Sequence, residues 1–552
     1  MTQPYVYDPS ALRDVFDQHF TFTAGFWRNV HRYAERLAML DPATGRSWTY
    51  AELGDDVRRL AAGLAARGVK PRDVITFQLF NSAEFALIYL AAQRLRAIAA
   101  PVNFRFSPGE TAYVLDDSLP AVHVFDASLA GATADALAIA THRPGLLVEV
   151  GEAAGEGTIP FWTLLETGTD LPAAGTGSTW DESTRLYTSG TTGMPKGVPL
   201  PSVAEVLTAH DVIMHFPLSP DDRTLNMTPW FHRGGISPGG PNAAFYAGAS
   251  VFPMRAFDPA TVLDYVARCG ITFLIGAPTN LALLAAEQEA RPRDLSSLRG
   301  IVTMGAPLER AACLRYQSVL TPRIFNGYGT TEAFWNTFLR PADLPDHAGS
   351  AGRACTDDDV AVAALTADGE SGTPDVLVPQ DGTTVGEVVM RSVKSGYAYV
   401  HNPAEEAARF REGWVFTGDL GTWDSLGYVT IVGRKDDMII SGGENVHPVQ
   451  VEEALNEHPL VRESLVVGVP DARWGEVVVA YVVPADGGTT GGLTAAECDK
   501  HLLAHPMLAN FKRPRGYKFV PTLPRTATGK LMHYKLREEA QSGTGLDEFD
   551  RP

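Results

Sequence analysis

Hydrophobic and polar positions follow helical and strand periods along much of the chain. Apolar residues recur at helical spacing in Tyr50–Ala66 and Glu84–Arg94. Asp73–Leu79 and Ala97–Val102 lie before and after the second of these helices and have the composition of strands, the latter a buried one. Because strands that alternate with helices of this length form layered sheets, the pattern predicts an α/β fold.

The same alternation returns later and then changes. Pro259–Cys269 is predicted to be a helix, Ile271–Ile275 a strand and Thr279–Glu289 a helix. After Arg434 the chain predicts a smaller unit, which we expect to be a separate domain. Its expected elements are, in order, a strand, a helix (Val449–Asn456), two strands (Glu463–Val469 and Val477–Val483) and two further helices. The last residues, Ala540–Pro552, are rich in Gly, Ser, Asp and Glu and are predicted to be a disordered tail.

The most informative segment of the sequence is Tyr187–Gly197, which reads YTSGTTGMPKG. Its glycines allow backbone N–H groups to approach an anion closely, and its lysine adds a positive charge, so the segment is typical of a loop that binds phosphate. It differs from the common nucleotide P-loop because Pro195 precedes Lys196 and Gly197 follows it.

This loop and four later motifs, in the same order, resemble the adenylate-forming superfamily and in particular its 4-chlorobenzoate- and benzoate-CoA ligases. The four motifs are Trp230–Gly235, Asn326–Glu332, Thr417–Asp419 with Gly433–Asp437, and Pro524–Lys530. The resemblance implies a large N-terminal domain (residues 1–434) of two layered αβ subdomains and a small β-barrel-like one. It also implies a hinge at residues 435–436 and a small, mobile α+β lid formed by residues 437–552.

The resemblance implies the residues that activate a carboxylic acid with ATP. Lys530 would bridge the carboxylate and the α-phosphate, Glu332 would bind Mg²⁺, and Thr188 would bind phosphate, with His232 also near the reacting atoms. Asn326 and Tyr328 would contact the adenine. Asp419, which is expected in a turn after the strand Trp414–Thr417, and Arg434 would contact the ribose. The other expected ATP or AMP contacts are Ser189, Gly190, Thr191, Thr192, Gly193, Lys196, Gly305, Ala306, Pro307, Gly327, Gly329, Thr330 and Thr331.

The same match implies a site for the acid. The sequence departs from the family pattern at two of its residues. Gly327 replaces a larger apolar residue of close aryl relatives, which predicts a wider or deeper site. Arg233 replaces a small or apolar residue and is expected either to pair with a polar substituent of the acid or to point to solvent. The residues expected around the acid are His232, Arg233, Gly234, Gly305, Gly327, Gly329, Phe334 and Trp335.

Coenzyme A is the second substrate that the resemblance implies. Trp474 and Phe511 would enclose its adenine, and Arg513 and Arg515 would face its phosphates; the alternative for both aromatic residues is the core of the lid. Rotation at Asp436 would exchange Lys530 for a loop that meets the pantetheine arm. The loop residues are Gly442, Gly443, Glu444 and Asn445.

Composition restricts the partners. The formal charge of −19 argues against nucleic acid or an anionic membrane surface as the main partner. The four cysteines show neither a disulfide framework nor a zinc-site spacing, and no signal peptide or membrane-spanning run is evident, so we expect a cytoplasmic protein without membrane insertion. A homodimer is left open.

We therefore expect an ATP-dependent acid–CoA ligase that forms an acyl-adenylate and releases pyrophosphate and AMP, with ATP, Mg²⁺, CoA and an aromatic or other cyclic acid as its small-molecule partners. A medium-chain acyl-CoA synthetase and an adenylation enzyme that loads a carrier protein are the alternatives. A luciferase-like oxygenase has no positive signal. A binding protein without activity would be expected to lack Lys530, Glu332 or Asp419, all of which are present.

Overall fold

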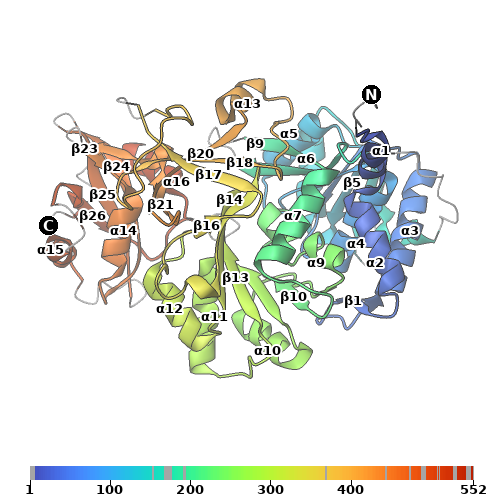
Figure 1. Cartoon of the computed structure of the whole chain (residues 1–552), viewed down its shortest axis with the longest axis horizontal. Coiled ribbons are helices and arrows are strands. Elements are labelled where there is room, and N and C mark those ends of the chain that lie inside the picture. The colour runs from blue at the N-terminus through green and yellow to red at the C-terminus, as the bar shows by residue number, and fades with distance from the viewer. Residues whose placement is uncertain are drawn as a thin grey trace, which may run out of the picture. The chain divides into compact units, whose positions relative to one another are not determined.

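The computed structural model forms two compact units, each built from separate stretches of chain. Figure 1 labels their helices and strands. The larger contains Met1–Ala348, Ala354–Asp359 and Met390–Val415, and the smaller contains Gly349–Arg353, Val360–Val389 and Phe416–Pro552. The described residues are 7–151, 155–166, 177–189, 194–366, 370–441, 444–471, 474–485, 493–505, 508, 510–525, 531–542 and 549–550.

A nine-stranded sheet contains most of the Asn326–Glu332 motif in its strand β14. Its strand order is β16-β15-β14-β13-β12-β10-β11-β1-β2. Neighbours from β10 to β14 run parallel, whereas β15 runs antiparallel to β14, with an irregularity between Tyr328 and Gly329. The strands are β1 (Leu37–Leu40), β2 (Ser47–Thr49), β10 (Arg223–Asn226), β11 (Ser250–Val251), β12 (Phe273–Gly276), β13 (Gly300–Met304), β14 (Ile324–Thr330), β15 (Phe334–Leu339) and β16 (Arg353–Ala354).

A seven-stranded sheet in the larger unit ends in the strands that flank the phosphate loop. The order is β7-β6-β5-β3-β4-β8-β9, and among the strand pairs that the described residues form in this sheet only β8–β9 is antiparallel. Its strands are β3 (Val74–Gln78), β4 (Ile98–Pro101), β5 (Val122–Asp126), β6 (Leu146–Val150), β7 (Ile159–Pro160), β8 (Glu182–Ser189) and β9 (Pro195–Pro201).

Some helices begin or end at residues that cap them. Thr49 and Glu52 form a capping box at the start of α3 (Tyr50–Ala66), and Asp258 caps α10 (Pro259–Cys269), which ends at Gly270 with φ +63°. The other helices of the larger unit are α1 (Ser10–His19), α2 (Phe22–Arg32), α4 (Ala83–Leu95), α5 (Pro108–Ser118), α6 (Ala130–Ile139), α7 (Ser202–His215), α8 (Arg233–Ile236), α9 (Ala243–Ala247), α11 (Pro278–Ala290), α12 (Arg310–Val319) and α13 (Pro403–Arg409).

A third, five-stranded sheet has the order β17-β18-β20-β19, with β21 paired to β20. Its strands β17, β18 and β20 each pass across the boundary between the two units. The strands are β17 (Asp358–Ala363), β18 (Gly386–Ser392), β19 (Phe410–Arg411), β20 (Trp414–Trp423) and β21 (Val429–Arg434).

The C-terminal part of the smaller unit is built on a fourth sheet, of order β23-β22-β25-β24 with β26 paired to β25. Alternate residues of β24 and β25 belong to two different hydrophobic clusters, because successive side chains of a strand point to opposite faces. This sheet is thus buried on both faces. Its strands and helices are β22 (Ile439–Ser441), β23 (Glu444–Val446), β24 (Val461–Asp471), β25 (Gly475–Pro484), β26 (Gly516–Phe519), α14 (Pro448–Asn456), α15 (Ala495–Ala504) and α16 (His533–Ser542).

The α/β class and the layered N-terminal sheets are confirmed, whereas the disordered tail is wrong where the structure describes it. Ala540 lies within α16 and is buried, Phe549 is buried, and Asp550 pairs with Tyr517. Composition misled here because a few apolar residues among polar ones suffice to anchor a terminus. The hinge at 435–436 and the domain limits based on it stay predictions.

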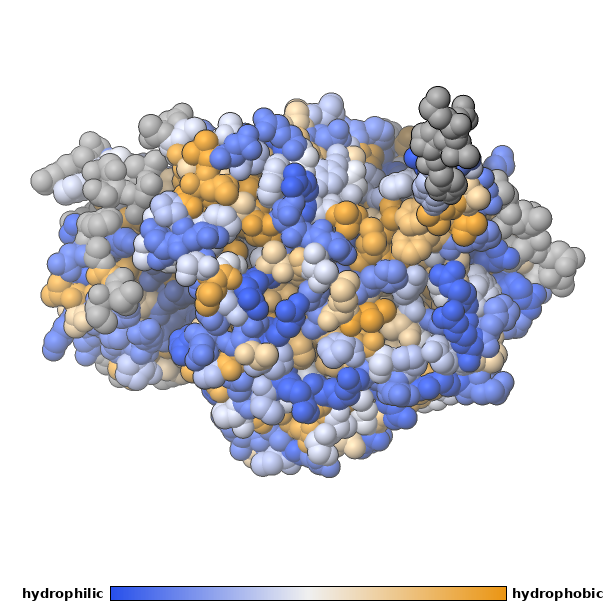
Figure 2. Space-filling model, in the orientation of Figure 1, coloured by the Kyte–Doolittle hydropathy of each residue, from blue (hydrophilic) through white to orange (hydrophobic). Residues whose placement is uncertain are grey.

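Within the described residues, no helix is long and apolar enough to cross a membrane. The face drawn in Figure 2 carries hydrophobic groups in separate areas among hydrophilic ones.

Candidate active site

The turn between β14 and β15 holds Glu332, the expected metal ligand. Its side chain is largely buried, and the hydroxyl of Tyr399 donates a hydrogen bond to Glu332 Oε1 over 2.5 Å. Burial and the adjacent carboxylate raise the pKa of Tyr399, so the phenol keeps its proton and remains a donor. Glu406 Oε2 in turn accepts the backbone N–H of Tyr399 over 3.0 Å. The Glu332 carboxylate is therefore oriented by a connected set of hydrogen bonds.

The strands β8 and β9 bring Thr188 opposite Lys196 in the phosphate-loop hairpin. Lys196 is buried, and its Nζ lies 2.5 Å from Glu405 Oε1 of α13. The next residue of this helix, Glu406, accepts the backbone N–H of Tyr399, which in turn binds Glu332. The helix α13 is thus linked to both Lys196 and Glu332. Several expected contacts of this loop, or their side chains, lie outside the described structure, and these are Ser189, Gly190, Thr191, Thr192 and Gly193.

Arg233 at the start of α8 is buried, with 2% of its surface exposed, so the alternative in which it points to solvent is wrong. Its Nη1 donates to the carbonyl of Thr331 over 2.7 Å, and its Nη2 donates to the carbonyl of Lys394 over 2.7 Å and to Thr208 Oγ1 over 3.1 Å. Burial lowers the pKa of Arg233 to about 10, which leaves it charged at neutral pH. Arg233 therefore ties the segment next to the expected acid site to the turn that holds Glu332.

His232 is the residue before this helix. Burial, followed by the charge of Arg105, lowers the pKa of His232 to about 4, so the imidazole is neutral at physiological pH. Its buried Nε2 has no hydrogen-bond partner among the residues that the structure describes. A neutral ring with an unpartnered nitrogen suits hydrogen bonding to a substrate better than it suits proton transfer at pH 7.

The space beside Gly327 is filled by Trp335, which corrects the expectation of a wider site. A Cβ at Gly327 would lie 2.5 Å from Trp335 Cε3 and 3.3 Å from Phe338 Cδ2. The absent side chain therefore accommodates an indole. Gly305 differs, since its φ is +85° and no atom lies within 4 Å of a Cβ built there, so it leaves open space at the end of β13. Of the residues that follow it, Ala306 is half-buried and Pro307 is exposed.

The other expected residues of this region follow β13 and β14. Met304 pairs in register with Gly327, and Thr303 pairs with Asn326, which is buried. Gly234 lies with its Cβ position 3.0 Å from the sulfur of Met304. Gly329 faces the backbone of Phe334, because a Cβ there would lie 1.6 Å from the carbonyl oxygen of that residue. Asn326, Gly327, Tyr328, Gly329, Thr330 and Thr331 thus form one continuous segment that leads to Glu332.

Asp419 and Arg434 lie in the smaller unit and pair with each other. Asp419 is within β20, which continues to Trp423, so the expected turn after Thr417 is wrong; the strand bends instead at Gly418, whose φ is +70°. Arg434 Nη1 lies 2.8 Å from Asp419 Oδ1 across the β20–β21 ladder. The pair presents a carboxylate and a guanidinium side by side, which suits ribose hydroxyls. Asp436 follows in a short 3₁₀ turn, 3.5 Å from Arg434.

The expected CoA residues are described only in part. Trp474 is 40% exposed, which excludes the lid core as its location. Arg513 forms an ion pair with Asp499, and Arg515 is exposed. The remaining expected residues lie outside the described residues or have side chains that do, and these are Gly442, Gly443, Glu444, Asn445, Phe511 and the catalytic candidate Lys530.

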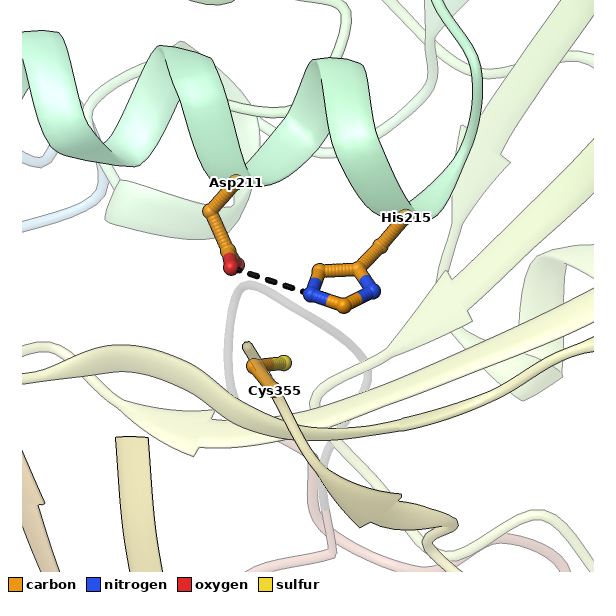
Figure 3. A group of neighbouring side chains, drawn as sticks. All are labelled: Asp211, His215 and Cys355. Atoms are coloured by element: carbon orange, nitrogen blue, oxygen red, sulfur yellow. Dashed lines mark ion pairs between the residues drawn. The ribbon is translucent and has the colours of Figure 1, made fainter. Parts of the chain in front are cut away.

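The sequence analysis missed a buried cluster of Asp211, His215 and Cys355 (Figure 3). Asp211 and His215 stand one turn apart on α7, with Asp211 Oδ1 3.2 Å from His215 Nε2. Three ligand-type atoms lie within 4.8 Å of one another, a spacing that could suit a metal ion. The i, i+4 pair was visible in the sequence, but Cys355 is far from it in the chain.

The surroundings of the cluster argue against a metal. Arg340 Nη2 donates to His215 Nδ1 over 2.5 Å, and the backbone N–H of Thr356 points at Nε2 from 3.3 Å. Burial, then the charge of Asp211, raises the pKa of the Cys355 thiol well above its usual value. Lys394 adds a further cation 3.1 Å from Asp211. We assign the cluster to a hydrogen-bonding network.

Two family models and several known proteins match this chain. The family model described as AMP-binding enzyme matches residues 26–398, and the model of the AMP-binding enzyme C-terminal domain matches residues 450–530. An indoleacetate–CoA ligase from Aromatoleum aromaticum is 34% identical over 94% of this chain and 99% of that protein. A 4-chlorobenzoate–CoA ligase from Arthrobacter is 33% identical over 92% of this chain and 93% of that protein.

A solved structure shows the same similarity in three dimensions. The anthranilate CoA ligase AuaEII in complex with anthranoyl-AMP matches with a TM-score of 0.86 and 26% identity, over 97% of this chain and 99% of that chain.

Proposed function

Since the chain belongs to the AMP-binding enzymes of the adenylate-forming superfamily, we propose that it is an AMP-forming acid–CoA ligase for aromatic or other cyclic carboxylic acids. The acid and ATP would give an acyl-adenylate and pyrophosphate. The thiol of CoA would then attack the acyl carbon, the bond to AMP would break, and the thioester and AMP would leave.

The observation that carries this proposal is similarity along nearly the whole chain to ligases named for ring acids, namely indoleacetate and 4-chlorobenzoate. A feruloyl-CoA synthase from Amycolatopsis, 35% identical over 89% of this chain, adds a third ring acid. The apolar aromatic side chains Phe334 and Trp335 beside the Glu332 turn support a flat acid.

The residues around Glu332 fit a magnesium ion. The ion prefers carboxylate and hydroxyl oxygens and keeps several waters, and Glu332 offers a carboxylate oriented by Tyr399 next to the hydroxyls of Thr330 and Thr331. When bound, the ion would neutralise charge on the phosphates of ATP. Glu332 would hold it, and the proton on Tyr399 would keep the carboxylate turned toward it.

The other roles in the proposed mechanism are positional. Asp419 and Arg434 would bind the ribose, Asn326 and Tyr328 the adenine, and neutral His232 would donate a hydrogen bond from its ring N–H to the acid carboxylate. Lys530 would stabilise charge at the α-phosphate. Rotation at Asp436 between the two half-reactions, with Trp474 among the residues that receive CoA, completes the proposal.

The test measures pyrophosphate release with ATP and Mg²⁺ across benzoates, bicyclic aryl acids and C4–C12 fatty acids, with and without CoA, and detects thioesters by mass. Turnover on ring acids that requires CoA and yields a thioester is the expected result. A preference for fatty acids would refute the acid class. Adenylate formation without thioester would refute the CoA assignment and indicate a carrier protein as acceptor.

A further inference from the structure

Trp335 is fixed at both ends by buried charges that the sequence analysis did not single out. Its indole N–H donates to Asp211 Oδ2 on α7. Its backbone carbonyl accepts a hydrogen bond from Lys394 Nζ over 2.9 Å. The same ammonium lies 3.1 Å from Asp211 Oδ2 and 2.5 Å from Asp358 Oδ2, so the two contacts of Trp335 belong to one network.

The network lies deep in the larger unit. Side chains of Lys394, Asp211 and Asp358 are exposed by 2%, 5% and 0%, respectively. Charged groups are rarely buried to this degree unless they are paired, and an ion pair of this kind is weak evidence for stability because removing both charges often costs nothing. A role in fixing a particular local geometry is therefore the more informative explanation.

The backbone next to Trp335 has a conformation that needs such support. Phe334 has φ +64°, a left-handed value that a bulky residue adopts only when its surroundings enforce it. Its ring lies 5.6 Å from the guanidinium carbon of Arg233 and 6.0 Å from Lys394 Nζ, so two cations face it. The irregular pairing of β14 and β15 occurs at this point.

The indole so fixed occupies the space beside Gly327. Trp335 Cε3 would lie 2.5 Å from a Cβ at Gly327, and its ring centroid is 4.6 Å from that of Phe338. Trp335 is thus a large flat side chain of the proposed acid site. Asp211 of α7 and Lys394, which follows β18, hold it in place.

We propose that Asp211 and Lys394 are positioning residues that hold Trp335 beside Gly327 and thereby set the size of ring acid that the enzyme accepts. The inference rests on the proposed function, because it assumes that Trp335 borders the acid. Asp211 acts through the indole N–H, and Lys394 acts through the Trp335 carbonyl and through the charge that it shares with Asp211. A released indole would change the selectivity between small and large acids without touching ATP or CoA.

The test compares Asp211→Asn, Trp335→Phe and the double variant with wild type on one monocyclic and one bicyclic acid. We expect each single variant to change the ratio of kcat/KM for the two acids by about tenfold, mainly through KM, with the KM values for ATP and CoA within twofold. In the Trp335→Phe background, Asp211→Asn should change the ratio by less than it does in wild type, because the indole N–H is already absent and only the contact of Asp211 with Lys394 remains. The matched control is Asp359→Asn, which removes an exposed ion pair with Arg391.

A spectroscopic readout separates positioning from a general structural effect. Protein labelled with 5-fluorotryptophan has nine fluorine sites, and the signal of Trp335 is the one that Trp335→Phe removes. We expect Asp211→Asn to shift or broaden that signal and to leave the other eight in place. If Asp211→Asn does not fold, Trp335→Phe alone must change the ratio of acids.

Three results would overturn the inference. They are an unchanged acid ratio in both single variants, additive effects in the double variant, and a Trp335 signal that Asp211→Asn does not alter. Failure of the proposed function gives a different result, since wild type would then form no thioester with any acid.

Discussion

The buried pair of Lys394 and Asp358 leads to a quantitative prediction about stability. Lys394→Met removes one ammonium that lies within 3.1 Å of two carboxylates, Asp358 and Asp211. Removing one partner of a buried ion pair leaves uncompensated charge and costs about 3–5 kcal/mol. We therefore expect the free energy of unfolding of the larger unit to fall by about that amount.

A matched control lies three residues away in the chain. Arg391 pairs with Asp359, but their side chains are 54% and 56% exposed. An exposed ion pair is worth about 0–1 kcal/mol, so Arg391→Met should be nearly neutral. Urea unfolding followed by circular dichroism, with the slope compared between variants, measures both changes.

The loss of stability caused by Lys394→Met should also depend on pH in a predictable direction. Burial raises the pKa of Asp358 even with Lys394 present, so the folded state holds a proton on this carboxyl more tightly than the unfolded state does. Stability gained from that proton is present at low pH and is lost as the pH rises through the folded-state pKa. Loss of Lys394 raises this pKa further, so the deficit of Lys394→Met should shrink as the pH falls from neutral toward the folded-state pKa. A deficit equal to that of Arg391→Met, or one that grows on acidification, would refute the reasoning.

Three further predictions concern the proposed active site. Tyr399→Phe removes the hydroxyl that orients Glu332, a charge-assisted hydrogen bond worth about 1.5–3 kcal/mol; adenylation should need more Mg²⁺, measured as a magnesium titration of pyrophosphate release, and an unchanged titration would contradict this role. Trp474→Ala should raise the KM for CoA and spare adenylation, whereas Trp180→Ala, at a 64% exposed tryptophan, should do neither; equal effects on both half-reactions would argue against a CoA contact. The His232 ring, with its pKa near 4, should show no titration between pH 5.5 and 8 by NMR, and an inflection there would show that the imidazole is less buried than described.

Much of the fold follows from local patterns. The helix Tyr50–Ala66 has the bounds that its apolar spacing predicts, because a capping box fixes its start. Pro259–Cys269 is equally well defined by Asp258 and Gly270 at its ends. By contrast, the composition of Thr417-Gly418-Asp419 predicts a turn, whereas all three residues lie in β20. Pairing with β21 keeps Asp419 in the strand, and local composition does not report a long-range pairing.

Some residues of the candidate site can be predicted from the sequence and others cannot. Glu332 and the Asp419–Arg434 pair lie in motifs that the sequence shows directly. The partners of Trp335 do not, because Asp211 and Lys394 come from segments more than a hundred residues apart and only the folded chain brings them together. Arg233 had two open interpretations for the same reason, since its carbonyl partners at residues 331 and 394 leave no pattern in the sequence.

The sheet of the smaller unit is buried on both faces, and this limits where the chain can be shortened. One face of β24 and β25 is covered by residues that include Leu536, Ala540 and Phe549, all within the last twenty residues. A deletion of this segment would uncover a row of valines and leave their strands with one apolar face toward water. A shortened C-terminal segment would therefore promote aggregation.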